Sequence, residues 1–183
     1  MNKKELRSKY KQLRKELSKQ EMAERSLAIF EMTESGFELE GKAISVFLPI
    51  ERFSEIDTWH FLRKIKANFY LPVINGENEL VHIKYENPSQ IKVSDWGIPE
   101  PTFGENISPK DLDFVLVPLL AIDEKGFRAG YGKGFYDQFL ADCAPNCQFI
   151  GLNYFDPIEK IDDLHEADVP LQYCVSPKGI EQF

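Results

Sequence analysis

The twelve residues from Gly126 to Asp137, GFRAGYGKGFYD, are the part of the sequence best suited to chemistry. They include four glycines, and the cations Arg128 and Lys133 precede the closing aspartate. Glycine is costly to order, so a run of this kind marks backbone that approaches a ligand closely or adopts positive φ. Together with the two cations, the glycines predict a loop whose backbone N–H groups bind phosphate oxygens.

Asp137 adds a carboxylate that can hold a magnesium ion bridging such phosphates. An acid in the first turn of a helix also interacts favourably with the helix dipole, by up to ~1 kcal/mol, and for an isolated aspartate this is the more common explanation. The neighbouring cations and glycines favour the metal role for Asp137.

The stretch differs from two well-known nucleotide-binding patterns. A Walker loop needs glycine where Phe127 stands, and Ser or Thr where Gly134 stands. The dinucleotide fingerprint needs a third glycine at the position of Asp137. We therefore expect a phosphate-binding loop of another kind.

The segments on either side show how such a loop is positioned. Residues 112–122, LDFVLVPLLAI, form the strongest strand pattern in the chain, with the continuous apolar character of a central parallel strand. A helix is predicted directly after the glycines, over residues 134–143. Ligands of open parallel sheets bind beyond the carboxyl ends of the strands, where helices begin. The sequence thus predicts the site at that edge of the sheet.

The remaining elements alternate in the same way. Ser18 and Glu21 have the spacing of a capping box, and Ser54 and Asp57 form a similar helix start. We predict helices over residues 3–18, 19–36 and 54–67, and strands over 42–49, 68–74, 79–85, 148–154 and 173–177, with 86–111 irregular. Alternating strands and helices predict a three-layer α/β/α Rossmann-like fold with a mainly parallel central sheet. We expect one domain over residues 1–183.

Composition narrows the class of partner. The net charge of −8 argues against a general nucleic-acid binder, although a local cluster of cations can still bind a small anion. The sequence has neither an apolar signal-peptide core nor a run long enough to span a membrane. Its three cysteines lack zinc-site spacing. We expect a cytoplasmic monomer that acts on small molecules, with no nucleic-acid or membrane partner.

Several segments resemble the 5-formyltetrahydrofolate cyclo-ligase family, also called methenyltetrahydrofolate synthetases. GFRAGYGKGFYDQFL resembles the family signature, and the resemblance continues in order along nearly the whole chain. The other matching segments are KKELR near the N-terminus, FLPIERFSEIDT, WGIPEP, DLDFVLVPLLAID and EADVPLQ.

The resemblance implies an enzyme that uses ATP and Mg²⁺ to convert 5-formyltetrahydrofolate into 5,10-methenyltetrahydrofolate, releasing ADP and phosphate. The formyl oxygen is a poor leaving group, so its phosphorylation makes cyclisation by N10 feasible. Enzymes that transfer phosphoryl groups mainly position the reactants and offset charge. By the resemblance, Lys133 and Arg128 are catalytic, and Asp137 and Asp168 hold the metal.

The family match also assigns binding residues. Those for ATP are Lys3, Lys4, Arg7, Arg128, Gly130, Tyr131, Gly132, Lys133, Gly134, Phe135 and Tyr136. Those for folate are Ile50, Glu55, Trp96, Tyr131, Gly132, Lys133, Gly134 and Phe135. Glu55 is assigned to the aminopyrimidinone edge of the pterin, whose hydrogen-bond donors suit a carboxylate acceptor.

Each of these residues also has a simpler explanation. A lysine-rich helix around Lys3 and Arg7 is usually a solvated face, and Glu55 has the position of a first-turn helix acid. Trp96 can anchor a loop, and Asp168 stands in an acidic loop. Ile50 can pack in the core.

Departures from the family pattern keep two further hypotheses open. Phe135 stands where the family usually has Tyr, Ala129 replaces Leu, and a glutamine expected after residue 154 has no clear counterpart. One alternative is a folate- or nucleotide-binding module without efficient turnover, and another is an unrelated phosphosugar or CoA-ester enzyme. The three histidines fall outside every motif, and we assign them no role.

Overall fold

The computed structural model describes residues 1–76, 79–95, 97–158 and 160–183. The helices are α1 (Lys3–Glu16), α2 (Lys19–Gly36), α3 (Trp59–Lys64) and α4 (Phe135–Ala141). The strands are β1 (Ala43–Ser45), β2 (Asn68–Ile74), β3 (Leu80–Lys84), β4 (Ile91–Val93), β5 (Pro99–Pro101), β6 (Asn106–Ile107), β7 (Phe114–Pro118), β8 (Ala121–Ile122), β9 (Arg128–Ala129), β10 (Gln148–Leu152), β11 (Tyr173–Ser176) and β12 (Gly179–Gln182).

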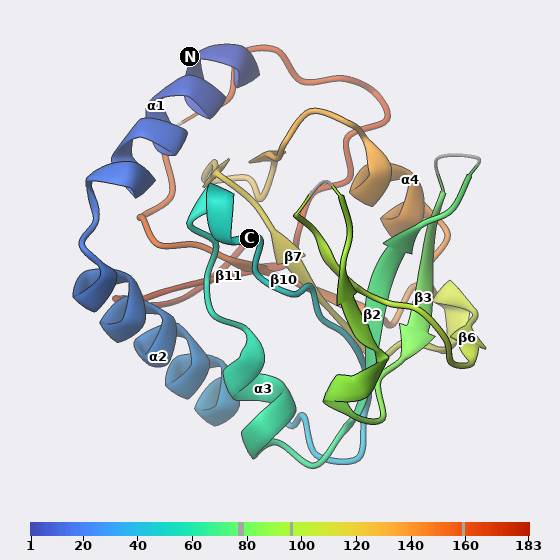
Figure 1. Ribbon diagram of the computed structural model, residues 1–183. Coiled ribbons are helices and arrows are strands. Elements are labelled where there is room, and N and C mark those ends of the chain that lie inside the picture. The colour runs from blue at the N-terminus through green and yellow to red at the C-terminus, as the bar shows by residue number, and fades with distance from the viewer. Residues whose placement is uncertain (77–78, 96, 159) are drawn as a thin grey trace.

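A large sheet runs through the centre of the molecule (Figure 1). In the described part of the chain it has eight strands, in the order β12-β11-β10-β7-β1-β2-β3-β6. The inner strands from β11 to β2 pair in parallel, whereas β12, β3 and β6 add antiparallel edges. The predicted α/β fold with a mainly parallel sheet is confirmed.

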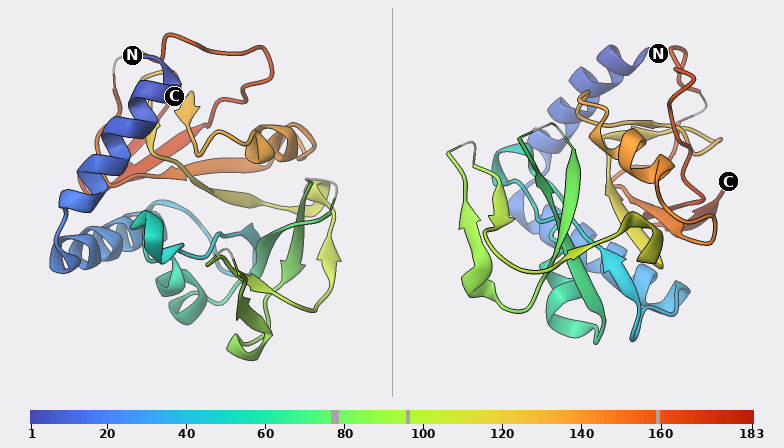
Figure 2. Two further views of the ribbon diagram at one scale, coloured as in Figure 1. Left: turned by 45° about the horizontal axis from the view of Figure 1, so that its top comes forward. Right: turned by 90° about the vertical axis from the view of Figure 1, so that its right-hand side faces the viewer.

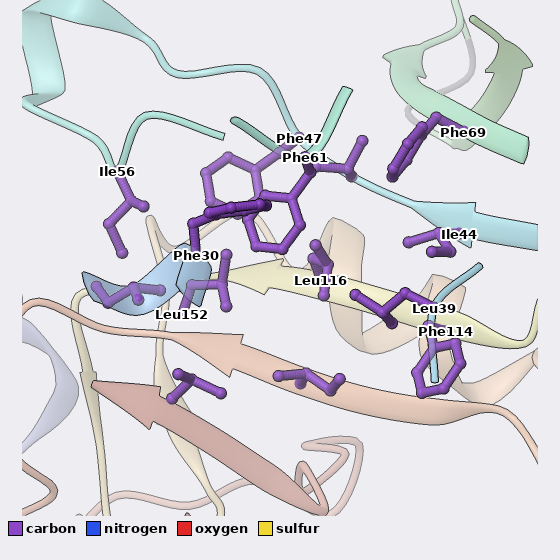
Figure 3. Packing of buried hydrophobic residues seen from close by; sticks show 14 of the residues in the cluster. Phe30, Leu39, Ile44, Phe47, Ile56, Phe61, Phe69, Phe114, Leu116 and Leu152 are labelled. Carbon is purple, nitrogen blue, oxygen red and sulfur yellow. The ribbon is translucent and has the colours of Figure 1, made fainter. Parts of the chain in front are cut away.

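Helices cover both faces of the sheet because the side chains of each strand alternate between them. Leu116 of β7 belongs to the core under α2 and α3, whereas its neighbours Val115 and Val117 pack with α4. Figure 2 shows α4 on the opposite side of the strands from α2 and α3. In the first core, Phe30 and Phe61 meet edge to face, with ring centroids 5.1 Å apart (Figure 3).

The strand order contains a switch point between β1 and β7. From β1 the chain passes through α3 to β2 on one side, and from β7 it passes through α4 to β10 on the other. Neighbouring connections that leave on opposite faces open a crevice at the carboxyl ends of their strands. The N-terminal helix α1 lies beside this crevice, where it packs against the small β8–β9 pair.

Capping explains where the two long helices begin. Asn2 and Glu5 form a capping box at the start of α1, and Ser18 and Glu21 form the predicted one at the start of α2. Each box pairs two backbone N–H groups that the helix itself leaves free.

The predicted helix over residues 54–67 is wrong at its N-terminus. Ser54 adopts a left-handed conformation with φ of 48° and closes a 3-10 turn, Glu51–Phe53. The helix starts only at Trp59, because residues 50–58 form a compact loop in which the Glu55 carboxylate accepts a hydrogen bond from the Ile50 amide. This loop carries Ile50 and Glu55, two of the residues predicted to bind folate.

Two other predictions differ in detail. Residues 86–111 are not wholly irregular, since they contain the β4–β5 pair and β6. The strand predicted over 42–49 is limited to β1, and the antiparallel edge strand β12 was missed. None of the helices in the described ranges combines the length and apolar character needed to cross a membrane.

Candidate active site

A cavity of about 530 Å³ lies at the switch point of the sheet. Ile50 follows β1, Ile74 ends β2 and Pro118 ends β7, and all three line the cavity. The stretch 128–137 and one side of α1 complete its walls. Its volume falls in the range of small-molecule sites, about 300–1,000 Å³.

Positive charge distinguishes this cavity from the other hollows of the surface. Its lining includes six cations and two acids: Lys3, Arg7, Lys11, Arg52, Arg128 and Lys133, with Asp137 and Asp168. Two hollows of about 530 and 570 Å³ near residues 34–42 have Lys42 as their one cationic lining residue. A local excess of cations in a protein of net charge −8 draws anions to the cavity.

The N-terminal helix and the glycine stretch meet although they are far apart in sequence. The Arg7 Nε donates a hydrogen bond of 2.8 Å to the Gly130 carbonyl oxygen. Gly132 has φ of 94°, and a Cβ there would lie 3.1 Å from the Arg7 guanidinium carbon. Glycine at 132 is therefore favoured by its positive φ, and it leaves room for the Arg7 side chain.

Arg128 is held in place by two partners. Only 7% of its surface is exposed, its guanidinium donates to the Val169 carbonyl at 2.6 Å, and it pairs with Asp137 Oδ1 at 2.8 Å. Asp137 Oδ1 also accepts from the Val169 amide. Burial lowers the pKa of Arg128, and the Asp137 carboxylate opposes that change.

A second ion pair closes the same side of the cavity. The Lys3 ammonium lies 2.5 Å from Asp168 Oδ2, which also accepts from the His165 amide at 2.6 Å. Partial burial of Asp168 works to raise its pKa, but the His165 amide, Lys3 and Arg128 together lower it below the usual range. Asp168 is therefore ionised at neutral pH.

Asp137 and Asp168 are the acids of the cavity that could hold a magnesium ion. Among the described residues, Asp137 Oδ2 and Asp168 Oδ1 make no hydrogen bond or ion pair, so each carboxylate has an oxygen to offer. No group of three or more His, Cys, Asp or Glu side chains gathers as a metal site in the part of the chain that the structure describes. Mg²⁺ commonly binds one or two carboxylates and completes its shell with phosphates and water.

Glu55 lies behind the cavity wall rather than in it. The Tyr131 ring lines the cavity and stacks on Phe53, with centroids 5.0 Å apart. Glu55 lines a separate small void together with Arg14. Burial raises the pKa of Glu55, while hydrogen bonds from Tyr131 and the Ile50 amide and the charge of Arg14 lower it.

Most of the predicted site residues gather around the one cavity. Those in its lining are Lys3, Arg7, Ile50, Arg128, Gly130, Tyr131, Gly132, Lys133, Gly134, Phe135, Tyr136, Asp137 and Asp168. Lys4 is exposed on α1 and does not line it. Trp96 lies outside the described residues.

Sequence reasoning missed several residues of the site. Lys11 follows Lys3 and Arg7 at intervals of four, a helical spacing that places all three on one side of α1. That regular spacing was an available signal. Arg14, three residues after Lys11, continues this spacing. No comparable signal marks the others, which are Arg52, Phe53, Ile74, Ile98 and Pro118.

A cation-lined cavity at the switch point of a mostly parallel sheet makes this an α/β protein with a cavity suited to an anionic ligand. Its sequence and fold also match known proteins. The chain belongs to the 5-formyltetrahydrofolate cyclo-ligase family, whose sequence profile matches residues 1–172. The predicted family and its enzymatic class are thereby confirmed.

Individual relatives agree with this assignment. A Haemophilus influenzae protein named 5-formyltetrahydrofolate cyclo-ligase is 30% identical over 141 residues, which cover 72% of this chain and 74% of the relative. An Escherichia coli protein of the same name is 28% identical over 157 residues, 76% and 80% of the two chains. The solved structure of Aquifex aeolicus 5,10-methenyltetrahydrofolate synthetase has a TM-score of 0.84 at 30% identity, covering 100% of this chain and 93% of the other.

Proposed function

We propose that this protein converts 5-formyltetrahydrofolate into 5,10-methenyltetrahydrofolate, with ATP as co-substrate and Mg²⁺ as cofactor. The observation that carries the proposal is the convergence of six cations and two carboxylates on one cavity beside the glycine stretch. A triphosphate is the co-substrate whose charge suits that arrangement, and the family supplies the folate.

The reaction proceeds by two successive displacements. The formyl oxygen attacks the γ-phosphorus and ADP leaves, which converts the formyl group into an imidate-like phosphate. N10 then attacks the formyl carbon, its proton is released, and inorganic phosphate departs as the methenyl bridge closes. The first step needs the formyl oxygen and the γ-phosphate in line, so catalysis depends on positioning and charge.

Lys133 is suited to the changing charge of the γ-phosphate. Its side chain is exposed at the cavity, and among the described residues it has no ion-pair partner. Arg128 is fixed by Asp137 and Val169 and can contribute charge only from a constant position. We assign to Lys133 a contact that can follow the γ-phosphate, and to Arg128 a positive charge held in one position.

The two carboxylates with available oxygens are the proposed metal ligands. Asp137 and Asp168 line the same cavity from different segments. A bound Mg²⁺ would neutralise charge on the phosphate oxygens. The residues that hold these acids in place are Arg128, Lys3 and the backbone at 165 and 169.

Folate recognition is assigned to the opposite wall. Phe53, Ile74 and Ile98 give that wall its apolar character, and Tyr131 also lines the cavity. Glu55 interacts with the Tyr131 side chain, and we assign its carboxylate to the aminopyrimidinone edge of the pterin.

The test follows the near-ultraviolet absorbance of the methenyl product. We expect product only when protein, 5-formyltetrahydrofolate, ATP and Mg²⁺ are all present, and none when EDTA removes the metal. Folate binding without product would favour a binding module that lacks turnover, an outcome to which Phe135 lends weight because it brings no hydroxyl to the cavity. Absence of both binding and product would refute the proposal.

A further inference from the structure

Arg14 is a buried arginine close to the proposed folate site that the reaction scheme above does not use. It lies on α1 with only 3% of its surface exposed. Its guanidinium donates to the Tyr131 hydroxyl at 3.0 Å and to the Leu119 carbonyl at 2.5 Å, and it lies 5.6 Å from the centre of the Tyr154 ring.

Neither hydrogen-bond partner of Arg14 in the described part of the chain is acidic. In the described ranges it has no ion pair within 4 Å, and its buried Nε has no hydrogen-bond partner. A buried cation without a counter-charge is costly. Its presence under the cavity wall therefore calls for an opposite charge nearby.

Glu55 supplies that charge across a small void. Arg14 and Glu55 both line this void, which is too small to admit a water molecule. Arg14 is buried and Glu55 is half-buried, so solvent screens the attraction between the two charges less than it would at an exposed site. The two side chains also share Tyr131, whose hydroxyl accepts from Arg14 and bonds to Glu55.

Three phenols that interact with Glu55 are neutral at physiological pH. They come from three separate segments: Tyr131 from the glycine stretch, Tyr136 from α4 and Tyr154 from the segment after β10. Burial raises the pKa of each of these phenols, so none carries charge. Within the described residues, Arg14 is the one cation whose charge acts on the Glu55 carboxyl.

We propose that Arg14 is a positioning residue of the folate subsite, which orients Tyr131 and places a positive charge beside Glu55, the assigned hydrogen-bond acceptor for the pterin. This inference rests on the proposed function, since it takes Glu55 as the pterin acceptor. Burial works to neutralise Glu55, and Arg14 opposes it. A neutral carboxyl loses its capacity to accept two hydrogen bonds side by side.

Arg14→Met tests this role with two separate measurements. The first is the titration of Glu55 in the unliganded protein by NMR of ¹³C-labelled glutamate, with the resonance assigned by Glu55→Gln. The second is the dissociation constant of 5-formyltetrahydrofolate between pH 5 and 9. We expect the Glu55 pKa to rise, the loss of affinity at acidic pH to begin at a higher pH, and binding at pH 7 to weaken roughly tenfold.

Arg25→Met is the matched control. Arg25 also donates to a backbone carbonyl, that of Tyr154, and also lies over an aromatic ring, that of Phe155. Arg25→Met therefore removes the same kinds of contact as Arg14→Met, but it removes no charge that acts on Glu55. We expect its Glu55 titration and its pH profile to match the wild type.

Two outcomes would overturn the proposal in distinguishable ways. A folded Arg14→Met protein whose Glu55 titrates as in the wild type would refute the role of Arg14 alone. If the wild-type protein does not bind folate, the proposed function fails and the subsite role fails with it. If Arg14→Met does not fold, Arg14→Lys is the second test. Lysine keeps the positive charge, but its ammonium cannot reproduce both guanidinium hydrogen bonds, to Tyr131 and to Leu119. Wild-type folate affinity in Arg14→Lys would therefore also contradict the proposal.

Discussion

The two ends of the proposed active site are built in different ways. The phosphate end, formed by Lys3, Arg7, Lys133, Asp137 and Asp168, is a roomy cavity rich in charge. At the folate end, Glu55 and Arg14 line a small void that has no room for a water molecule, and Arg14 donates to Tyr131. We expect the first to attract a highly charged ligand from solution, and the second to favour a specific set of hydrogen bonds.

The difference has a consequence for substitutions. At the phosphate end, loss of an exposed cation should reduce turnover and leave the fold unchanged. At the folate end, loss of a buried charge should change binding, stability and pH dependence together, because those quantities depend on the same desolvated pair.

The largest expected effect is that of Lys133→Met at the phosphate end. We expect kcat/KM to fall about 100- to 1,000-fold, because charge on the transferred phosphoryl group loses its exposed partner. The free energy of unfolding should change by less than ~0.5 kcal/mol, since the side chain is exposed. Product absorbance and urea denaturation measure the two quantities.

Lys125→Met is the control for that prediction. Lys125 is also an exposed lysine and lies eight residues earlier, outside the cavity lining. Its activity should equal that of the wild type. Equal losses in both variants would mean that net charge rather than position explains the effect.

Asp137→Asn should affect turnover and stability together, which sets it apart from Lys133→Met. The change removes a proposed metal ligand and the counter-charge of the buried Arg128. We expect activity to fall about 100-fold and the free energy of unfolding to fall by about 1–3 kcal/mol. Raising the Mg²⁺ concentration should restore part of the activity and none of the stability in the absence of nucleotide.

Glu55→Gln sharpens the contrast at the folate end. We expect affinity for 5-formyltetrahydrofolate to fall about 10- to 100-fold, because a charged acceptor is lost. Burial raises the folded-state pKa of Glu55, so the folded protein binds more protons than the unfolded chain between the ordinary and the raised pKa. The contribution of Glu55 to stability is therefore greatest below its ordinary pKa and is lost as the pH rises through the raised value.

The amide of the Glu55→Gln variant does not ionise, so it loses no stability through ionisation at any pH. Relative to the wild type, the free energy of unfolding of Glu55→Gln should thus increase as the pH rises above the ordinary glutamate pKa. Denaturation curves from pH 4 to 8 measure this difference, with the exposed Glu51→Gln as control. A constant difference across that range would contradict the raised pKa of Glu55.

The smallest expected effects come from the glycines of the loop. Gly132→Ala forces a side chain into positive φ beside Arg7 and should lower the free energy of unfolding by about 1–2 kcal/mol. Gly130→Ala has open space around the added carbon and φ outside the left-handed region, so its stability should stay within ~0.5 kcal/mol. Thermal denaturation distinguishes the pair, and equal losses would contradict the close approach of α1 to Gly132.

Much of the phosphate end was predictable because its residues are neighbours in sequence. Strand β7, the glycines and Asp137 follow one another within a short segment, and the order strand, loop, helix places them at one edge of a parallel sheet. The folate end was less accessible. Glu55 was expected in the first turn of a helix, but the left-handed Ser54 and the 3-10 turn before it place Glu55 in a loop, where it lines a small void with Arg14.

By itself, the sequence determined the inner strands, the first two helices, the position of the glycine stretch after a central strand, and the resemblance to the family. These follow from apolar runs, capping residues and glycine spacing, which act over a few neighbouring positions. Only the tertiary structure decided which cations of α1 reach the cavity, that Asp137 pairs with Arg128, and that Arg14 faces Glu55. Those relations join segments separated by nine to more than one hundred residues, and they depend on how the helices and loops pack rather than on any local pattern.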